Sequence, residues 1–227
     1  MNNKSLIKKV KNLPVPILPT MVGAFTLSNV YSGMGYTWVR HITAWAAIAV
    51  ILSYILKICF HFDTVKKEYS NTIPASLYAG FTMLTMILGS YFYNASPVFG
   101  KTLWFVGLIL HAIQILVFTY NNVIKNFNMQ TFVPSWFVTY NGIMVSTVVG
   151  GVMNEPLIGK IVVYYGIAVF TVIIPFMIYR LAKHEIKDPV YHTQAILLAP
   201  SSLCLVSYLN FISTPNKFII YYLYCAV

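Results

Sequence analysis

Long apolar runs separated by short polar connections dominate the sequence from residue 14 onward. Seven of these runs contain about 20 mainly apolar residues, the length that a helix needs to cross the hydrocarbon core of a bilayer. We therefore predict seven transmembrane helices joined by short connections. Their ranges are Pro14–Tyr31, Ile42–Phe60, Ile73–Tyr93, Phe99–Tyr120, Phe132–Met153, Ile161–Tyr179 and Thr193–Ile212.

The two ends of the chain depart from this regular pattern. Residues 1–13 form a basic N-terminal segment, which we expect to be cytoplasmic, and residues 14–227 form the transmembrane domain. A basic stretch before an apolar run is also typical of a signal peptide. The absence of an Ala-x-Ala-like cleavage site and the prolines at the start of the run favour a retained helix.

An eighth apolar run opens at Lys217 and reaches only Val227, the last residue. These residues would form about 16 Å of helix, roughly half of a hydrocarbon core. A chain end in mid-bilayer would leave a carboxylate and unpaired carbonyls in lipid. We therefore expect seven full spans plus a truncated eighth, as in a fragment, a truncated gene or a partial copy.

The prolines repeat along the chain. Six of the 11 lie in odd-numbered runs, and the second and fourth runs contain none. Pro19, Pro74, Pro134 and Pro200 are separated by 55, 60 and 66 residues, the spacing of a repeated helical hairpin. A proline inside a helix frees a carbonyl, which membranes tolerate only where it is buried in protein or faces a water-filled cavity. The pattern therefore favours odd helices that surround a pore.

The predicted fold is an all-α polytopic membrane protein. Its helical hairpins would form a quasi-symmetric ring, with odd helices inside and even helices outside. A plainer explanation stays open, because prolines are common in membrane helices and small residues mark close helix packing. On the pore hypothesis, the candidate pore-lining or helix-kink residues are Pro16, Pro19, Gly23, Pro74, Ser76, Pro134, Ser135, Pro200 and Ser201.

Composition and charge support this interpretation. Hydrophobic residues make up 58% of the 227 residues and charged residues 9%, against about 25% charged residues in a soluble domain. The net charge of +10 is unevenly distributed, because 11 Lys and Arg fall on the N-terminal side and 4 on the other. This bias predicts a cytoplasmic N-terminus. We interpret the charge as an orientation signal and expect no nucleic-acid partner.

The predicted helices contain little reactive chemistry. None of them contains Asp or Glu, and His111 is the only clearly embedded ionisable side chain. Its place on an even helix favours a hydrogen-bonded packing role over a proton relay. The three cysteines lack metal-ligand spacing, and no hydrolase, metalloprotease or phosphate-loop motif is present. We therefore expect no enzyme activity, no cofactor and no metal.

Three segments carry a resemblance to a known family. They are Leu18-Pro-Thr-Met-Val-Gly-Ala-Phe-Thr-Leu-Ser28, Val133-Pro-Ser-Trp-Phe-Val-Thr-Tyr-Asn-Gly-Ile143 and Ala195-Ile-Leu-Leu-Ala-Pro-Ser-Ser-Leu-Cys-Leu-Val-Ser-Tyr-Leu209. They resemble the first, fifth and seventh helices of the tellurite-resistance/dicarboxylate transporter family, which includes bacterial tellurite-resistance proteins, malic acid transporters and plant slow anion channels.

The resemblance implies ten helices in five hairpins, with odd helices around a central pore, in a homotrimer. It implies selective anion passage gated by a phenylalanine on the ninth helix, so the gate residue is unknown in this chain. Gly23 matches a small residue that lines the first helix of the family pore. The helix-kink positions of the family match Pro19, Pro74, Pro134 and Pro200.

A neutral inner surface distinguishes between kinds of transport. Cation channels commonly use rings of carboxylates, whereas backbone N–H groups, hydroxyls and helix N-termini attract anions without formal charge. We therefore expect a plasma-membrane channel that passes small monovalent anions through the pore. The alternatives are a transporter of C4-dicarboxylates such as malate, or of tellurite, and a non-functional truncated remnant.

Overall fold

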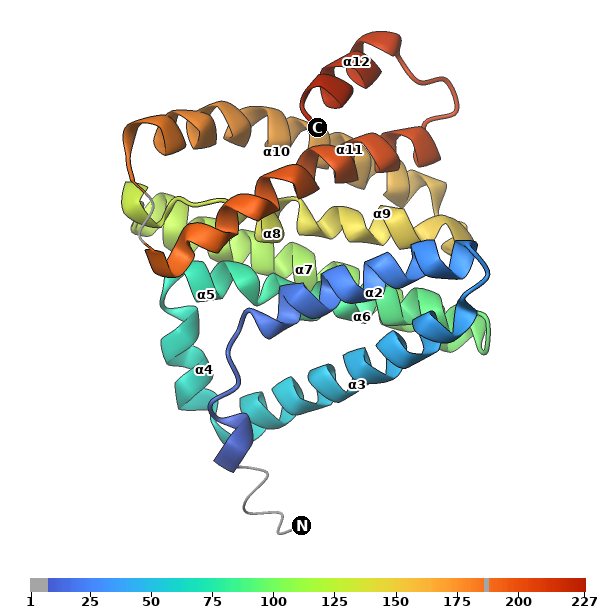
Figure 1. Ribbon diagram of the computed structural model, residues 1–227, viewed down its shortest axis with the longest axis horizontal. Helices are drawn as coiled ribbons and strands as arrows, with labels where there is room; N and C mark the ends of the chain where they lie inside the picture. Colours follow the sequence, from blue (N-terminus) through green and yellow to red (C-terminus); the bar gives the residue numbers. More distant parts are fainter. Residues whose placement is uncertain (1–7, 186–187) are drawn as a thin grey trace.

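The computed structural model describes residues 8–185 and 188–227, and every regular element in this part of the chain is a helix. The long helices lie side by side and run back and forth between two ends of the molecule (Figure 1). The elements are α2 (Ile17–Gly33), α3 (Thr37–Phe60), α4 (Phe62–Tyr69), α5 (Thr72–Leu77), α6 (Ala79–Tyr93), α7 (Pro97–Thr119), η1 (Tyr120–Lys125), η2 (Met129–Thr131), α8 (Trp136–Tyr140), η3 (Gly142–Met144), α9 (Val145–Val149), η4 (Gly150–Met153), α10 (Pro156–Lys183), η5 (Asp188–Leu197), α11 (Leu198–Phe211) and α12 (Lys217–Cys225).

Five helical spans in the described residues are long and apolar enough to cross a membrane. The prediction of an all-α polytopic membrane protein is thereby confirmed. These spans fall in the second, third, fourth, sixth and seventh predicted ranges. Their bounds are Thr37–Phe60, Thr72–Tyr93, Pro97–Lys125, Pro156–Lys183 and Tyr191–Phe211.

The first and fifth predicted ranges contain shorter helices. α2 has 17 residues, and the fifth range is divided into α8, η3, α9 and η4. Pro134 cannot donate a backbone hydrogen bond at the start of this range, and Gly142, Gly150 and Gly151 are poor helix formers. These residues explain why one continuous α-helix does not form there.

The spans differ greatly in how far the rest of the protein covers them. In the apolar stretch of 18 residues within each span, 78% of the residues of Thr72–Tyr93 are buried, but only 22% of those of Thr37–Phe60. Tyr191–Phe211, an odd-numbered span, is 28% buried, the same as the even-numbered Pro156–Lys183. The odd-inside, even-outside ring therefore stays a prediction, with the third span as its most enclosed member.

Glycines allow the α6–α7 hairpin to close tightly. A Cβ on Gly100 would lie 2.5 Å from the Tyr93 backbone and 2.6 Å from the Gly89 carbonyl oxygen. A Cβ on Gly89 would lie 2.7 Å from the Gly100 carbonyl oxygen. Membrane helices approach closely where such small residues face one another, so these two glycines set the hairpin's spacing.

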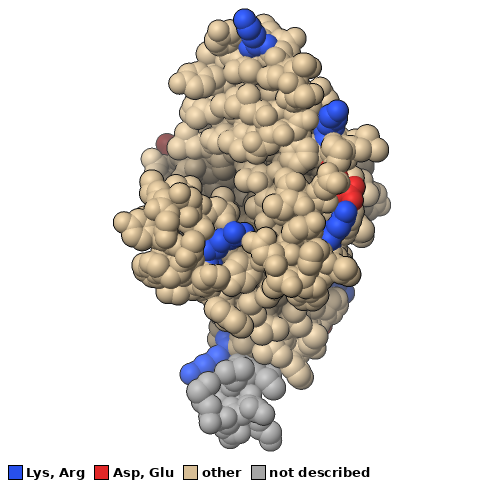
Figure 2. Space-filling view, turned by 90° about the vertical axis from the view of Figure 1, so that its right-hand side faces the viewer, with Lys and Arg blue, Asp and Glu red and all other residues tan. Residues whose placement is uncertain are grey.

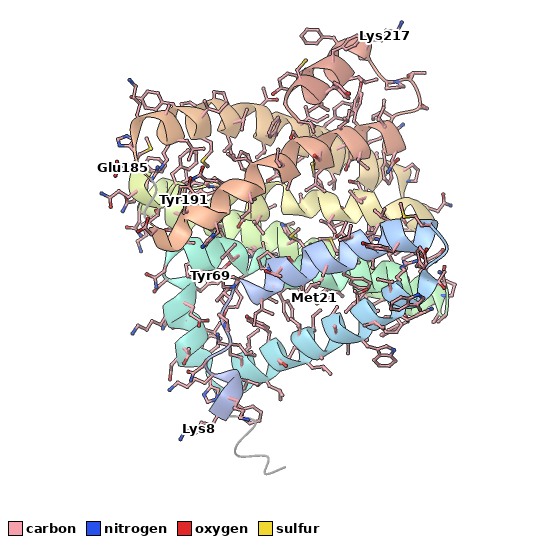
Figure 3. The ribbon with its side chains drawn as sticks, in the orientation of Figure 1. Lys8, Met21, Tyr69, Glu185, Tyr191 and Lys217 are labelled. Atoms are coloured by element: carbon pink, nitrogen blue, oxygen red, sulfur yellow. The ribbon has the colours of Figure 1, made fainter. Side chains whose placement is uncertain are left out.

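The two ends of the molecule carry different charged groups. Lys8 and Glu185 lie at one end, called the N-terminal end, and Lys217 lies at the opposite end (Figure 3). The opposite end bears few charged side chains and is hollowed left of its centre (Figure 2). There, Lys101 and Glu155 form an ion pair of 2.6 Å. Two residues of the predicted charge bias, Lys4 and Lys187, lie outside the described residues.

A buried ion pair fixes the N-terminal segment against the helices. The Nζ of Lys57, whose side chain is fully buried, lies 2.8 Å from both carboxylate oxygens of Glu68. It also donates to the Leu13 carbonyl oxygen at 2.7 Å. Tyr78 donates to Glu68, and Tyr54 donates to the Pro14 carbonyl oxygen. The cluster therefore joins α3, α4 and α6 to the chain that leads into α2.

Candidate functional site

A groove of about 780 Å³ lies along one side of the helices. Every residue that lines it belongs to an odd-numbered predicted span. α2 and α11 form its two rims, and they stand in front of α6, α8 and α9 in Figure 1. We call it the odd-helix groove. Its lining residues are Pro19, Val22, Gly23, Thr26, Leu27, Val30, Met83, Phe137, Val138, Gly142, Val145, Val148, Val149, Ala195, Ile196, Ala199, Pro200, Ser202, Leu203 and Val206.

The lining of the groove is apolar and uncharged. It contains no Asp, Glu, Lys, Arg or His, and its only side-chain hydroxyls belong to Thr26 and Ser202. The Ser202 hydroxyl donates to the Leu198 carbonyl oxygen at 2.8 Å. A solute in the groove would therefore meet apolar side chains with two hydroxyl groups among them.

Three predicted site residues line the odd-helix groove, namely Pro19, Gly23 and Pro200. Gly23 leaves open space, because a Cβ at this position would have no atom within 4 Å. Gly80, on the neighbouring helix α6, is different, since its Cβ would lie 2.8 Å from the Pro19 backbone nitrogen. Gly80 therefore permits close packing of α2 on α6, while Gly23 keeps the groove wide.

The repeated prolines share a position in their helices. Pro19, Pro74 and Pro200 are each the third residue of α2, α5 and α11. Pro134 opens the turn that leads into α8, where Phe137 donates a backbone bond to its carbonyl oxygen. The first turn of a helix lacks intrahelical acceptors for its N–H groups, so a proline there loses no bond. The prolines are therefore regularly spaced because each lies near the start of an odd-numbered helix.

The remaining predicted residues lie outside the lining of the groove. The hydroxyls of Ser76 and Ser135, both fully buried, form a hydrogen bond of 2.8 Å between α5 and the start of α8. Ser201 is buried and donates to the Leu198 carbonyl oxygen at 3.4 Å. Pro16 precedes α2, and its carbonyl oxygen accepts from the Thr20 hydroxyl at 2.9 Å. Pore lining by these residues remains a prediction.

His111 holds three helices together. Its Nδ1 lies 2.7 Å from the Thr82 hydroxyl on α6, and its Nε2 lies 2.9 Å from the Thr139 carbonyl oxygen on α8. The side chain is fully buried and is absent from the lining of the groove. Both ring nitrogens are thus occupied by packing contacts, in keeping with the structural role favoured by the sequence.

The fifth span was predicted to face the pore through Pro134 and Ser135, but other residues of this span line the groove. Val138, Gly142, Val145 and Val149 line it from this span. Their spacings of four, three and four residues place them on one face of a helix. This helical spacing of small and β-branched residues is present in the sequence and could have predicted the lining. The prolines and glycines of the span were considered instead, and they indicate only where the helix is interrupted.

Comparison with known proteins gives two results. The family model described as voltage-dependent anion channel matches residues 17–221. The chain is also 22% identical over 170 residues to the tellurite resistance protein TehA homolog of Haemophilus influenzae. This match covers 72% of the chain and 50% of the relative, so the chain spans about half the length of that relative.

Proposed function

The chain belongs to the voltage-dependent anion channel family, and on that premise we propose that it forms part of a channel for small monovalent anions. The odd-helix groove would be one side of the conduction pathway. Pro19, Gly23 and Pro200 are proposed as pore-lining residues, because they line the groove from both of its rims. The neutral lining is the observation that carries the proposal.

The electrostatics of the groove and its N-terminal end favours anions over cations. A carboxylate ring would favour cations, and the lining contains no carboxylate. α2, α5 and α11 all run away from the N-terminal end (Figure 1), so the partially positive ends of their helix dipoles point toward that end. The Lys and Arg excess at that end would raise the local concentration of anions.

A coupled carrier is the second candidate, since the relative from Haemophilus influenzae is described as a tellurite resistance protein. Carriers of dicarboxylates would be expected to bind the two carboxylates with Arg or Lys inside the membrane. The lining of the odd-helix groove contains neither residue. This difference favours uncoupled passage of small anions over a dicarboxylate carrier.

We further propose a multi-pass protein of the plasma membrane with a cytoplasmic N-terminus, assembled as a homotrimer. The charge bias between the connections supports the orientation. The trimer rests on the family resemblance alone. In such an assembly each subunit would contain its own pathway, so the groove would face the centre of the subunit rather than the contact between subunits.

Reconstitution in liposomes tests the function. The protein, in the length that its gene encodes, is expected to dissipate chloride and nitrate gradients faster than a potassium gradient, without any proton requirement. Ion-selective electrodes would report each flux. Transport that saturates with malate and needs a proton gradient would favour the carrier. The absence of flux from correctly folded protein would overturn both candidates and favour a non-transporting remnant.

A further inference from the structure

A second cavity, of about 320 Å³, lies among α4, the start of α5 and η1. It shares no residue with the odd-helix groove. α4 and the start of α5 are at the N-terminal end of the molecule (Figure 1). We call this cavity the lysine pocket, and its lining residues are Lys66, Tyr69, Ser70, Thr72, Asn121, Asn122, Lys125 and Asn126.

The lysine pocket combines positive charge with hydrogen-bond donors. Its lining has two lysines, three asparagines, three hydroxyl groups and no carboxylate. The Ser70 and Thr72 hydroxyls already donate within the protein, so the donors left for a ligand are the lysines, Asn121 and Asn126. Neither Lys66 nor Lys125 takes part in an ion pair among the described residues. α4 contains two acids, Asp63 and Glu68. Neither forms an ion pair with Lys66 in the described structure, and Glu68 is bound by Lys57 and Tyr78. The two lysines therefore keep their charge available for an external anion.

Two other polar cavities in the described part of the chain contain acids. The cavity near the end of α10 includes Glu185 and Asp188, and the cavity at the opposite end includes Glu155. Carboxylates would repel an anion and compete for the lysines. The lysine pocket is therefore distinguished by its lack of acids as well as by its cations.

Hydrogen bonds fix the walls of the lysine pocket. The Thr72 hydroxyl donates to the Asn122 Oδ1 at 2.7 Å, and the Asn122 amide donates to the Phe118 carbonyl oxygen at 3.1 Å. These bonds hold the start of α5 against η1, a π-helix of six residues. Single-turn π-helices occur frequently at functional sites.

The depth of the pocket indicates where its ligand would lie. Thr72 begins one membrane-spanning stretch and Lys125 ends another, so the pocket opens at the level of the lipid headgroups. Basic pockets between transmembrane helices are suited to phosphate-bearing headgroups. Lysine binds phosphate as a point charge, while several neutral donors suit the oxygens of a tetrahedral group.

From this arrangement we propose that the lysine pocket binds a phosphate monoester or inorganic phosphate at the N-terminal end, outside the conduction pathway. Both ligands present a tetrahedral oxyanion. It would lie between Lys66 and Lys125, with Asn121 and Asn126 as further donors. The cavity has room for such a group and several waters, since a water occupies about 30 Å³ of liquid. The proposal is independent of which ion the groove conducts.

Native mass spectrometry of the full protein in detergent would test this site with three probes: phosphatidic acid, phosphatidylcholine and inorganic phosphate. The test variant is Lys66→Gln/Lys125→Gln. The matched control is Lys67→Gln/Lys183→Gln, which removes two lysines near the N-terminal end that do not line the pocket. We expect the test variant to lose affinity for phosphatidic acid by about 30-fold, because two charge contacts are removed. The control should lose less than about threefold.

The outcomes separate the sources of the phosphate. Selective loss of phosphatidic acid binding alone supports a lipid headgroup, and selective loss of inorganic phosphate binding alone supports a soluble ligand. Equal losses in the test and control variants would indicate general surface attraction and overturn the proposal, as would equal binding of phosphatidylcholine and phosphatidic acid. Asn121→Ala, which leaves the charge intact, should weaken binding relative to the unmodified protein if neutral donors hold the oxyanion. If Asn121→Ala changes the binding of neither phosphatidic acid nor inorganic phosphate, a built site is contradicted.

Discussion

Gly23 faces the odd-helix groove from α2 with open space where a side chain would stand. A larger side chain at this position would narrow the groove without disturbing the packing of the helices. Glycine costs a helix up to about 1 kcal/mol relative to alanine, so a glycine in an α-helix with space for a side chain calls for another reason. On the proposed function, that reason is the width of the pathway.

Gly23→Phe should therefore reduce anion flux while leaving the protein folded. An aromatic ring in an apolar pathway narrows it and favours its dewetting, so we expect a loss on the order of tenfold. Liposome flux would measure the effect, and thermal unfolding in detergent should shift by less than about 3 °C. Gly33→Phe is the matched control, because Gly33 also has open space but lies outside the groove. Equal flux in both variants would argue against conduction through the groove.

Lys57 is the second residue whose surroundings predict a measurable effect. Its fully buried ammonium contacts Glu68 and the Leu13 carbonyl oxygen. Lys57→Met leaves the carboxylate without its counter-charge. Breaking a fully buried ion pair costs about 3–5 kcal/mol, and because Glu68 is 25% exposed we expect the lower end of this range. A loss of about 3 kcal/mol should lower the Tm in detergent by roughly 6–12 °C in a chain of this size.

The matched control for this prediction is the ion pair between Lys101 and Glu155. Both side chains are about one-third exposed, at 36% and 30%, and exposed pairs contribute about 0–1 kcal/mol. Lys101→Met should therefore change unfolding by less than about 4 °C. Similar shifts in the two variants would mean that burial of Lys57 adds nothing to stability.

At the scale of elements, the apolar pattern predicted where the helices are. The prolines were interpreted as kinks inside the helices, whereas Pro19, Pro74 and Pro200 lie in the first turns of α2, α5 and α11. Helices occupy all seven predicted ranges, since helix length and hydropathy follow directly from the bilayer. The division of the fifth range into α8, η3, α9 and η4 was not predicted. Pro134 and the three glycines weaken a continuous helix there, and tertiary contacts hold the separate pieces in place. Asn141, for example, donates to the Gly166 carbonyl oxygen across to α10 at a distance of 3.0 Å.

The α6–α7 hairpin offers a test of helix packing. Gly100→Ala would place a methyl group 2.5 Å from the backbone of Tyr93 and 2.6 Å from the Gly89 carbonyl oxygen. Because both neighbours are backbone atoms, neither can move aside, and we expect destabilisation of about 1–3 kcal/mol. Gly151→Ala provides the comparison, since a Cβ there has no atom within 4 Å. If Gly100→Ala raises the thermal unfolding temperature, the two helices are packed more loosely than these distances indicate.

At the scale of the whole molecule, the candidate site was predicted only in part. All residues that line the groove belong to odd spans, and Pro19, Gly23 and Pro200 are among them. That these spans surround a pore stays a prediction. Pro74 and Pro134, however, have the same spacing and lie outside the lining. A one-dimensional repeat gives the depth of a residue, whereas the direction it faces depends on how its helix is rotated against its neighbours.

The distribution of charge predicts how the whole molecule is oriented in the membrane. Ser70 lies at the N-terminal end, between α4 and α5, and Thr214 lies in the connection between α11 and α12 at the opposite end. In a variant whose three native cysteines are replaced by serine, Ser70→Cys should react with a membrane-impermeant maleimide only in permeabilised cells. Thr214→Cys should react in intact cells, because the end with fewer lysines faces outward. The reverse labelling pattern would place the basic end and the lysine pocket outside the cell. Phosphate-bearing lipids of the cytoplasmic leaflet could then not reach that pocket, so the orientation of the molecule also determines which ligands the pocket can meet.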